Sequence, residues 1–287
     1  MKIVVALLTL AAFGCRDSVE RRIAQEIARV DASLQASEKA KLNDEIKELP
    51  KMYREALDKA RAEQPVELRL YRLRNAAVGA DLLAFIAAHP EASATDLAPL
   101  TKLWNERRAA YDKPAEPVRG PLLHRALVQS SRDRAEKLFH ASLPYAKVSS
   151  PFAGVYYLAE AEGNRRFAEF VASLPGKERG PSPRKDRVEE AFRKLEAETL
   201  VAFGSDPTAA KMIPVSAKLK EAREQLDAGA VDGAALSLLE ARRRFSGAED
   251  DTVLPALAAL AAEQQALPAK KVLPASVTVA LVRWPYT

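Results

Sequence analysis

The feature that most constrains the fold of this chain is an apolar stripe along residues 151–174, whose members recur every three or four positions. They are Phe152, Tyr156, Ala159, Gly163, Phe167, Phe170 and Leu174. Residues at this spacing share one face of an α-helix, so the segment predicts a helix that packs through that face. Ser150 is a favourable N-cap for it. Gly163 indicates either a second helix crossing closely at this point or a weak position that costs about 1 kcal/mol relative to Ala.

Stripes of the same period recur along most of the chain, and period-two alternation is almost absent. They cover residues 19–34, 66–84, 97–111, 121–129, 132–143, 188–203, 214–228, 231–245 and 252–266. Glycine is scarce, at 11 residues, whereas Ala, Leu, Glu, Lys and Arg are abundant. This composition favours helices. We therefore predict an all-α protein of about ten helices, arranged as an array of antiparallel helices.

Two local signals set expected helix ends near the start of the chain. Asp17 and Ser18 are good N-cap residues, and Glu20 follows Asp17 at capping-box spacing, which predicts a helix start there. Pro50 should break or kink the helix before it. The charged segments 38–49 and 51–63 are typical of exposed helices or a two-helix hairpin.

The pair of helices around Gly229 predicts an αα-hairpin, with small residues such as Ala222 and Ala235 at the crossing. This unit resembles a tetratricopeptide repeat in its length and in its small-residue crossing. It lacks the Trp, Leu-Gly and terminal Pro positions of that family's consensus, and no second copy follows at a 34-residue period. A repeat array is therefore not established.

The N-terminal segment Met1–Cys15 has one cation, Lys2, and then an apolar run, Ile3–Phe13. Eleven residues are too few for a membrane-spanning helix, which needs about 20. The run is typical of the central region of a secretory signal. The ending Leu10–Cys15, with Gly14 before the only cysteine, resembles the lipobox of bacterial lipoproteins.

That resemblance implies cleavage before Cys15, lipid attachment to Cys15, and a location in the bacterial cell envelope, on a membrane and facing the periplasm or the cell exterior. An ordinary signal cleaved nearby, an uncleaved anchor and a buried thiol are the alternatives. Lys2 is the only charged residue of the removed part, so cleavage lowers the formal net charge from +5 to +4. This small excess does not predict a nucleic-acid partner, and the remaining chain has no cysteine for a disulfide.

The domain organisation follows from the linker signals. Residues 1–14 are assigned to the signal peptide and residues 15–175 to an N-terminal helical domain. Residues 176–187 are rich in Pro, Gly and Lys/Arg and are assigned to a linker. Residues 188–267 form a C-terminal helical domain, and residues 268–287 an extended tail.

The tail contains a β-branched run, Val277–Val282, between Pro274 and Pro285. A lone strand leaves its backbone groups unpaired, so the run needs a partner. Either it lies in a groove of its own helices or it adds to the sheet edge of a partner. The side chains that would make the contact in both cases are Val277, Val279, Leu281 and Trp284.

Catalytic signals are weak. The three histidines, His89, His124 and His140, form no metal-binding or haem-attachment pattern, and they are interpreted as a helix end and two partly exposed helix residues. Glu160 and Glu162 are the nearest candidates for a glycan-cleaving acid, but the arginines at 165 and 166 predict ordinary ion pairs.

We therefore predict no enzymatic activity, metal or cofactor. Arg242–Arg244 is interpreted as a solvated last helical turn. The chain is predicted to be a lipid-anchored helical envelope protein that serves as a protein–protein interaction scaffold or accessory subunit. An assembly or chaperone-like factor for envelope proteins is the first alternative, and an enzyme acting on cell-wall glycan is the second.

Overall fold

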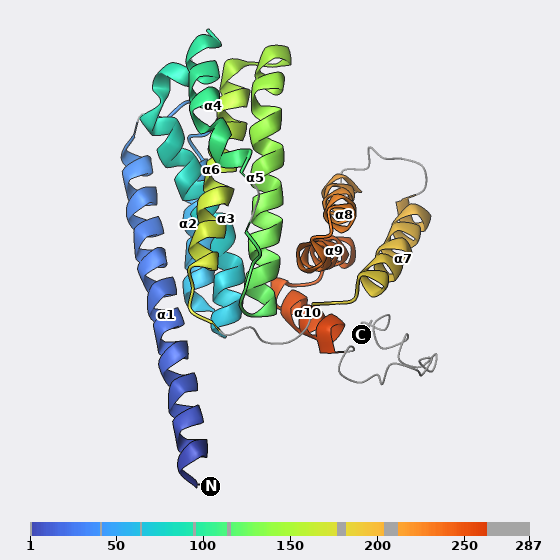
Figure 1. Ribbon diagram of the computed structural model, residues 1–287. Coiled ribbons are helices and arrows are strands. Elements are labelled where there is room, and N and C mark those ends of the chain that lie inside the picture. Colours follow the sequence, from blue (N-terminus) through green and yellow to red (C-terminus); the bar gives the residue numbers. More distant parts are fainter. Residues whose placement is uncertain are drawn as a thin grey trace. The chain divides into compact units, whose positions relative to one another are not determined.

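The structure is a computed structural model that describes residues 2–40, 42–63, 65–93, 96–113, 116–176, 182–203 and 212–262. These residues contain ten α-helices and two short 3-10 helices, η1 and η2, and no β-strand (Figure 1). The predicted all-α fold class is confirmed.

The chain divides into two compact units: residues 1–120 with 127–177 form unit 1, and residues 121–126 with 178–287 form unit 2. The helices of unit 1 are α1 (Lys2–Lys39), α2 (Leu49–Ala62), α3 (Val66–Ala88), η1 (Pro90–Ser93), α4 (Ala98–Tyr111), most of α5 (Leu122–Val148) and α6 (Pro151–Ala172). The helices of unit 2 are α7 (Lys185–Phe203), α8 (Met212–Asp227), α9 (Val231–Ser246), η2 (Asp250–Thr252) and α10 (Val253–Ala262).

Helix α3 forms the centre of unit 1 and is buried on nearly every side, because α1, α2 and α6 all pack against it. Its buried side chains include Leu70, Leu73, Ala77, Leu83 and Ile86. A helix that is apolar all round is stable in water only when its neighbours cover it completely. The sequence stripe predicted one buried face; the other faces are covered by helices that lie apart from it in the sequence.

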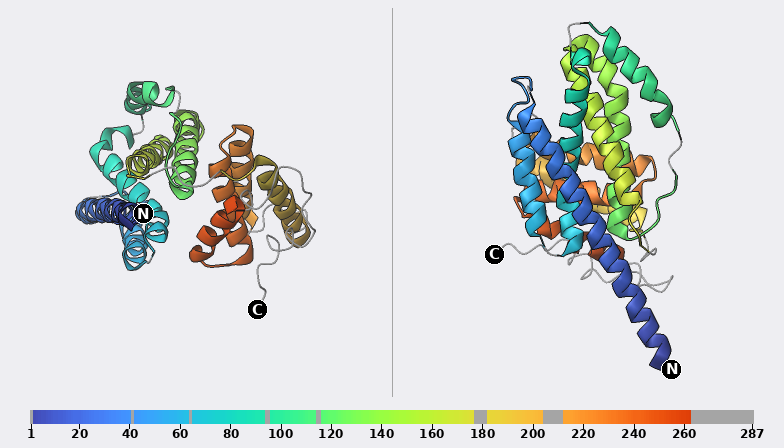
Figure 2. Two further views of the ribbon diagram at one scale, coloured as in Figure 1. Left: turned by 60° about the horizontal axis from the view of Figure 1, so that its bottom comes forward. Right: turned by 90° about the vertical axis from the view of Figure 1, so that its left-hand side faces the viewer.

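Helix α1 packs its predicted stripe into this core, with Ile23, Val30 and Leu34 fully buried. It begins at Lys2 and passes through Asp17 and Ser18 without interruption, so the predicted helix start at Asp17 is wrong. The preceding residues include three Leu and three Ala, which favour the helix, and no proline stands before Asp17. Figures 1 and 2 show the first part of α1 extending beyond the ends of α2 and α3.

Two further boundaries differ from prediction. Pro50 lies in the first turn of α2, where its missing N–H costs nothing, and residues 42–48 before it are non-helical rather than the end of a helix. The helical patterns 121–129 and 132–143 belong to the single helix α5, in which Ser130 and Ser131 are buried. Polar residues in a buried helix interior gave the false signal of a break.

The close crossing predicted at Gly163 is confirmed. A Cβ atom at this position would lie 2.6 Å from the carbonyl oxygen and 3.2 Å from the Cα of Val78, so the backbones of α3 and α6 approach closely there. Gly154, near the start of α6, meets α5 in the same way: a Cβ would lie 2.4 Å from the Cβ of Ala146. Both contacts exclude any side chain larger than hydrogen without movement.

Helix α9 is the central element of unit 2. Its residues 232–238 are all buried, and α7, α8 and α10 pack against it. Gly229, with φ +76°, lies in the short connection between α8 and α9, and Gly247, with φ +72°, ends α9 in the left-handed conformation that favours glycine. Gly229 therefore lies where the sequence indicated a turn.

Candidate functional site

The residue predicted to carry the lipid, Cys15, lies within α1. The first buried side chain that the structure describes in this helix is Ile23, eight residues further on. Arg22 donates to the backbone carbonyl of Ser173 and, at 3.2 Å, to its hydroxyl, so α1 is also tied to the end of α6. The chain thus passes from Cys15 to the core of unit 1 along one unbroken helix.

A buried carboxylate, Asp81, joins three helices of unit 1. Its Oδ1 lies 2.7 Å from Nη1 of Arg29 on α1, and Nη1 of Arg166 on α6 lies 3.4 Å away. Burial raises the pKa of Asp81, and the guanidinium of Arg29 lowers it in part. Because two cations face one carboxylate, we treat the group as ionised. The arrangement ties α1 and α6 to α3.

A second ionic cluster holds α1 to α2. Asp31 lies 2.8 Å from the guanidinium nitrogens of both Arg54 and Arg61, and Arg54 also donates to Glu38 at 2.6 Å. Hydrogen bonding by Arg61 and then by Arg54 lowers the pKa of Asp31. These groups are partly exposed, so the cluster adds modestly to stability. It holds α1 against α2, whereas the hairpin expected of segments 38–49 and 51–63 is not formed, because residues 42–48 are non-helical.

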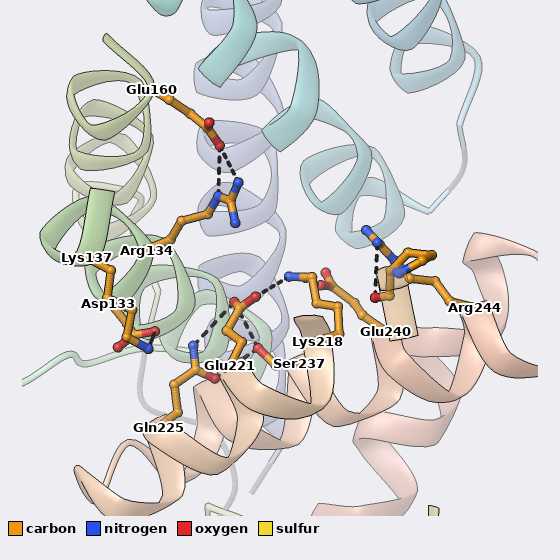
Figure 3. A network of polar contacts seen from close by, with 11 residues as sticks. Asp133, Arg134, Lys137, Glu160, Lys218, Glu221, Gln225, Ser237, Glu240 and Arg244 are labelled. Carbon is orange, nitrogen blue, oxygen red and sulfur yellow. Dashed lines mark hydrogen bonds and ion pairs between the residues drawn. The ribbon is translucent and has the colours of Figure 1, made fainter. Parts of the chain in front are cut away.

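Glu160 and Glu162, the candidates for glycan cleavage, are both engaged by arginines. Glu160 accepts two hydrogen bonds from Arg134, at 2.9 and 2.5 Å (Figure 3). Glu162 accepts from Arg165 at 2.9 Å and from the hydroxyl of Tyr111 at 3.2 Å. A general acid needs an apolar environment, whereas both of these carboxylates contact charged or polar side chains.

The tyrosine that contacts Glu162 belongs to an aromatic stack between α4 and α5. The fully buried ring of Phe139 lies nearly parallel to the rings of Trp104 and Tyr111, with centroids 4.9 and 4.0 Å away. Burial, reinforced by the charge of Glu162, raises the pKa of Tyr111, so its hydroxyl remains a donor. The stack attaches α4, of which only Leu100 and Leu103 are otherwise buried.

The carbonyl of Phe139 ties α4 to α5. It accepts a hydrogen bond from Nε1 of Trp104 at 3.1 Å and one from the hydroxyl of Ser142 at 2.7 Å. Pro144 lies inside α5 and lacks the N–H that would donate to the neighbouring carbonyl, that of His140.

Unit 2 contains a buried polar network between α8 and α9 (Figure 3). Nζ of Lys218 lies 2.7 Å from an oxygen of Glu221 and 2.7 Å from one of Glu240. The Ser237 hydroxyl lies 2.9 Å from the amide oxygen of Gln225. All of these side chains are buried or nearly so. Such a network contributes more to fixing the register of two helices than to net stability.

Each arginine of the Arg242–Arg244 triplet contacts a different element of unit 2. Arg242 pairs with Glu198 of α7, and Nη1 of Arg243 lies 2.8 Å from Asp250 of η2. Arg244 donates to the carbonyl of Pro214 in α8 at 3.4 Å. The prediction of a solvated turn holds for Arg244, which is exposed, but not for Arg242 and Arg243, which are half-buried and connect α9 to its neighbours.

The three histidines lie apart from one another in the fold. His89 ends α3, with Nδ1 3.4 Å from Glu91 and Nε2 3.4 Å from Arg107. His140 is exposed and meets Phe139 edge-on. His124 is buried, which corrects the prediction of partial exposure, because it lies in the segment 121–126 that packs within unit 2.

Four residues predicted to bind a partner belong to the C-terminal tail. The tail residues Val277, Val279, Leu281 and Trp284 lie outside the described residues. In the part of the chain that is described, no group of three or more His, Cys, Asp or Glu side chains is arranged to hold a metal ion. No described helix combines the length and the apolar character needed to cross a membrane.

The sequence interpretation missed Asp81 and Lys218. A signal existed for Asp81, which is the only Asp, Glu, Lys or Arg between Arg74 and Glu91, in the mainly apolar second half of α3. No such signal marked Lys218, because it alternates with other charged residues along α8 and its burial depends on packing against α9.

Comparison with known proteins finds no relatives: no family model matches the chain, and no curated protein and no solved structure has significant similarity to it.

Proposed function

We propose that this chain is a lipid-anchored helical protein of the bacterial cell envelope, held on a membrane through Cys15, and that its helices bind protein partners. The observation that carries the proposal is the continuity between the lipobox-like segment and the fold. Gly14-Cys15 ends an apolar run, and α1 continues through it into the core of unit 1.

The geometry supports a short anchor. Eight residues of helix separate Cys15 from Ile23, which corresponds to about 12 Å at 1.5 Å per residue. Two or three acyl chains on one cysteine would anchor the protein stably, whereas one chain gives only marginal binding. The body would then stand directly above the headgroups, and the exposed Arg21 would be placed to meet anionic lipid.

A binding role is favoured over catalysis by the state of the candidate carboxylates. Glu160, Glu162 and Asp81 each face at least one arginine, which suits a structural ion pair. The polar groups inside the units join helices to one another. The outer helix faces are then the surfaces that remain for protein partners.

We further propose that α8 and α9 form an antiparallel hairpin resembling a tetratricopeptide unit. The support is the order of their contacts: Ser237 meets Gln225 near the turn, and Glu240 meets Lys218 further from it. Ala222 and Ala235 are both fully buried. Small residues at that crossing would allow the backbones to approach.

Cysteines placed at positions 222 and 235 test the hairpin. Ala222→Cys with Ala235→Cys should oxidise to a disulfide within the chain, because bridging requires Cα atoms closer than about 7 Å. Non-reducing electrophoresis after digestion detects the link. Ala222→Cys with Ser246→Cys is the control pair and should remain reduced. A folded protein in which the first pair also stays reduced would contradict the hairpin.

The anchor is tested by fractionation of cells that express the full chain. Wild-type protein should be recovered in the membrane fraction and released only by detergent, whereas Cys15→Ala should lose lipid attachment and signal removal together. Ser18→Ala, three residues further on, is the control and should behave as wild type. Labelled fatty acid incorporated into Cys15→Ala as strongly as into wild type would refute attachment through Cys15.

Partner binding is tested by mild crosslinking in membranes, followed by identification of what is recovered with the protein. One or a few stoichiometric partners are expected. Many substoichiometric envelope polypeptides would instead support the assembly-factor alternative, and recovery of the protein alone would contradict both.

A further inference from the structure

In the described residues of unit 2, the exposed large apolar side chains lie at the end of α7 and at the start of α8, on either side of residues 204–211 in the sequence. Leu200 is 63% exposed and Val201 is 85% exposed in the last turns of α7, and Ile213, at the start of α8, is 58% exposed. Helix α7 buries its opposite face, including Phe192 and Leu195, against the unit. We call Leu200, Val201 and Ile213 the α7–α8 patch.

We propose that the α7–α8 patch is the docking site for the chain's own C-terminal segment, Val277–Trp284. The described part of unit 2 ends at residue 262, and the following 25 residues (263–287) include Val277, Val279, Leu281 and Trp284. An apolar segment and an apolar patch on the same unit each lower their free energy by burying surface against the other.

The connecting chain is long enough. Residues 263–276, 14 in number, separate α10 from Val277 and can span about 50 Å when extended. Without residues 263–287, unit 2 has about 90 residues, and a compact body of that size is about 30 Å across. Every part of the surface of unit 2 is therefore within reach.

Charge and shape also favour the segment Val277–Trp284 as the occupant of the α7–α8 patch. Glu196 is exposed one helical turn before Leu200, so the two share a face of α7. Arg283 stands beside Trp284 in the segment and carries the opposite charge. An extended chain places Val277, Val279 and Leu281 on one side, which matches a one-sided apolar contact and leaves the other side to solvent.

Trypsin measures the docking in the full-length, detergent-solubilised protein. Every protein compared, the one called wild type included, carries Lys270→Gln and Lys271→Gln, which remove the tryptic sites of the connecting chain, so cleavage after Arg283 requires the segment to leave the surface. A synthetic peptide of residues 272–287 gives the rate for the free segment. Wild-type protein should be cleaved at Arg283 about tenfold or more slowly than the peptide, since proteolysis follows the population of the open state.

The double variant Leu200→Asp, Val201→Asp should raise the cleavage rate to that of the peptide. The control is Val148→Asp, an equally exposed valine of unit 1 (81%), which should leave it unchanged. Circular dichroism establishes that each variant is folded. Wild-type cleavage as fast as that of the peptide would overturn the proposal and point to a segment reserved for a partner's sheet. An unchanged rate in the double variant would overturn it as well.

Disulfide trapping provides a second measurement, in which only one residue of the α7–α8 patch is changed. Leu200→Cys combined with Leu281→Cys should give an intramolecular link, identified by mass spectrometry of the joined peptides. Val148→Cys combined with Leu281→Cys should not. A link only between two chains would show that the segment docks on a second copy, and no link in a folded protein would show that it docks elsewhere; both contradict the proposal.

Discussion

Replacing Phe139 by Ala should lower the free energy of unfolding of unit 1 by about 3–5 kcal/mol. The side chain is fully buried between Trp104 and Tyr111, so its removal takes away both stacking partners at once. Near-parallel aromatic pairs contribute about 0.5–1.5 kcal/mol beyond the area that they bury. Helix α4 has few other buried contacts and should separate from α5 first.

Urea denaturation of the soluble Arg16–Thr287 protein, followed by circular dichroism, measures this effect. Phe170→Ala is the matched control, because Phe170 is only half-buried and lies at 6.3 Å from one ring, that of Phe167. Phe170→Ala should lower the free energy of unfolding clearly less than Phe139→Ala does. Equal losses for the two variants would show that the stack contributes nothing specific.

Gly163→Ala should destabilise unit 1 by about 1–3 kcal/mol, although alanine is the better helix former. In an uncrowded helix the change would stabilise by about 1 kcal/mol. Here the added Cβ would lie 2.6 Å from a backbone oxygen of Val78, and neither backbone can turn aside as a flexible side chain would. The two effects have opposite signs, so the sign of the measured change decides whether the crossing is tight.

Asn75→Ala provides the control for helix propensity. Asn75 is an exposed residue of α3, and replacing it should leave stability unchanged or raise it slightly. Thermal unfolding of both variants and wild type gives the comparison. A stabilised Gly163→Ala protein would contradict the close approach of α3 and α6.

The sequence allowed us to predict those structural features that depend only on residues one or two helical turns apart. The stripes of α1 and α6 identified buried residues such as Ile23 and Phe167, and a glycine among large residues identified the crossing at Gly163. The same local reasoning placed the turn at Gly229 correctly. These features are local because a helix face is determined by residues three and four positions apart.

Features that depend on distant residues were not predictable in this way. The burial of Asp81 requires Arg29, 52 positions earlier, and the role of Arg242 requires Glu198 on another helix. The continuity of α5 was missed because Ser130 and Ser131 resemble loop residues until their burial is known. In each case the tertiary packing, rather than local propensity, decides the outcome.

The central claim is that the protein is attached to a membrane through Cys15, and mass spectrometry of the native N-terminus tests it most directly. We expect the mature chain to begin at Cys15 and this residue to carry two or three acyl chains. Detection of Met1, or of any residue other than Cys15, at an unmodified N-terminus of the membrane-extracted protein would contradict it.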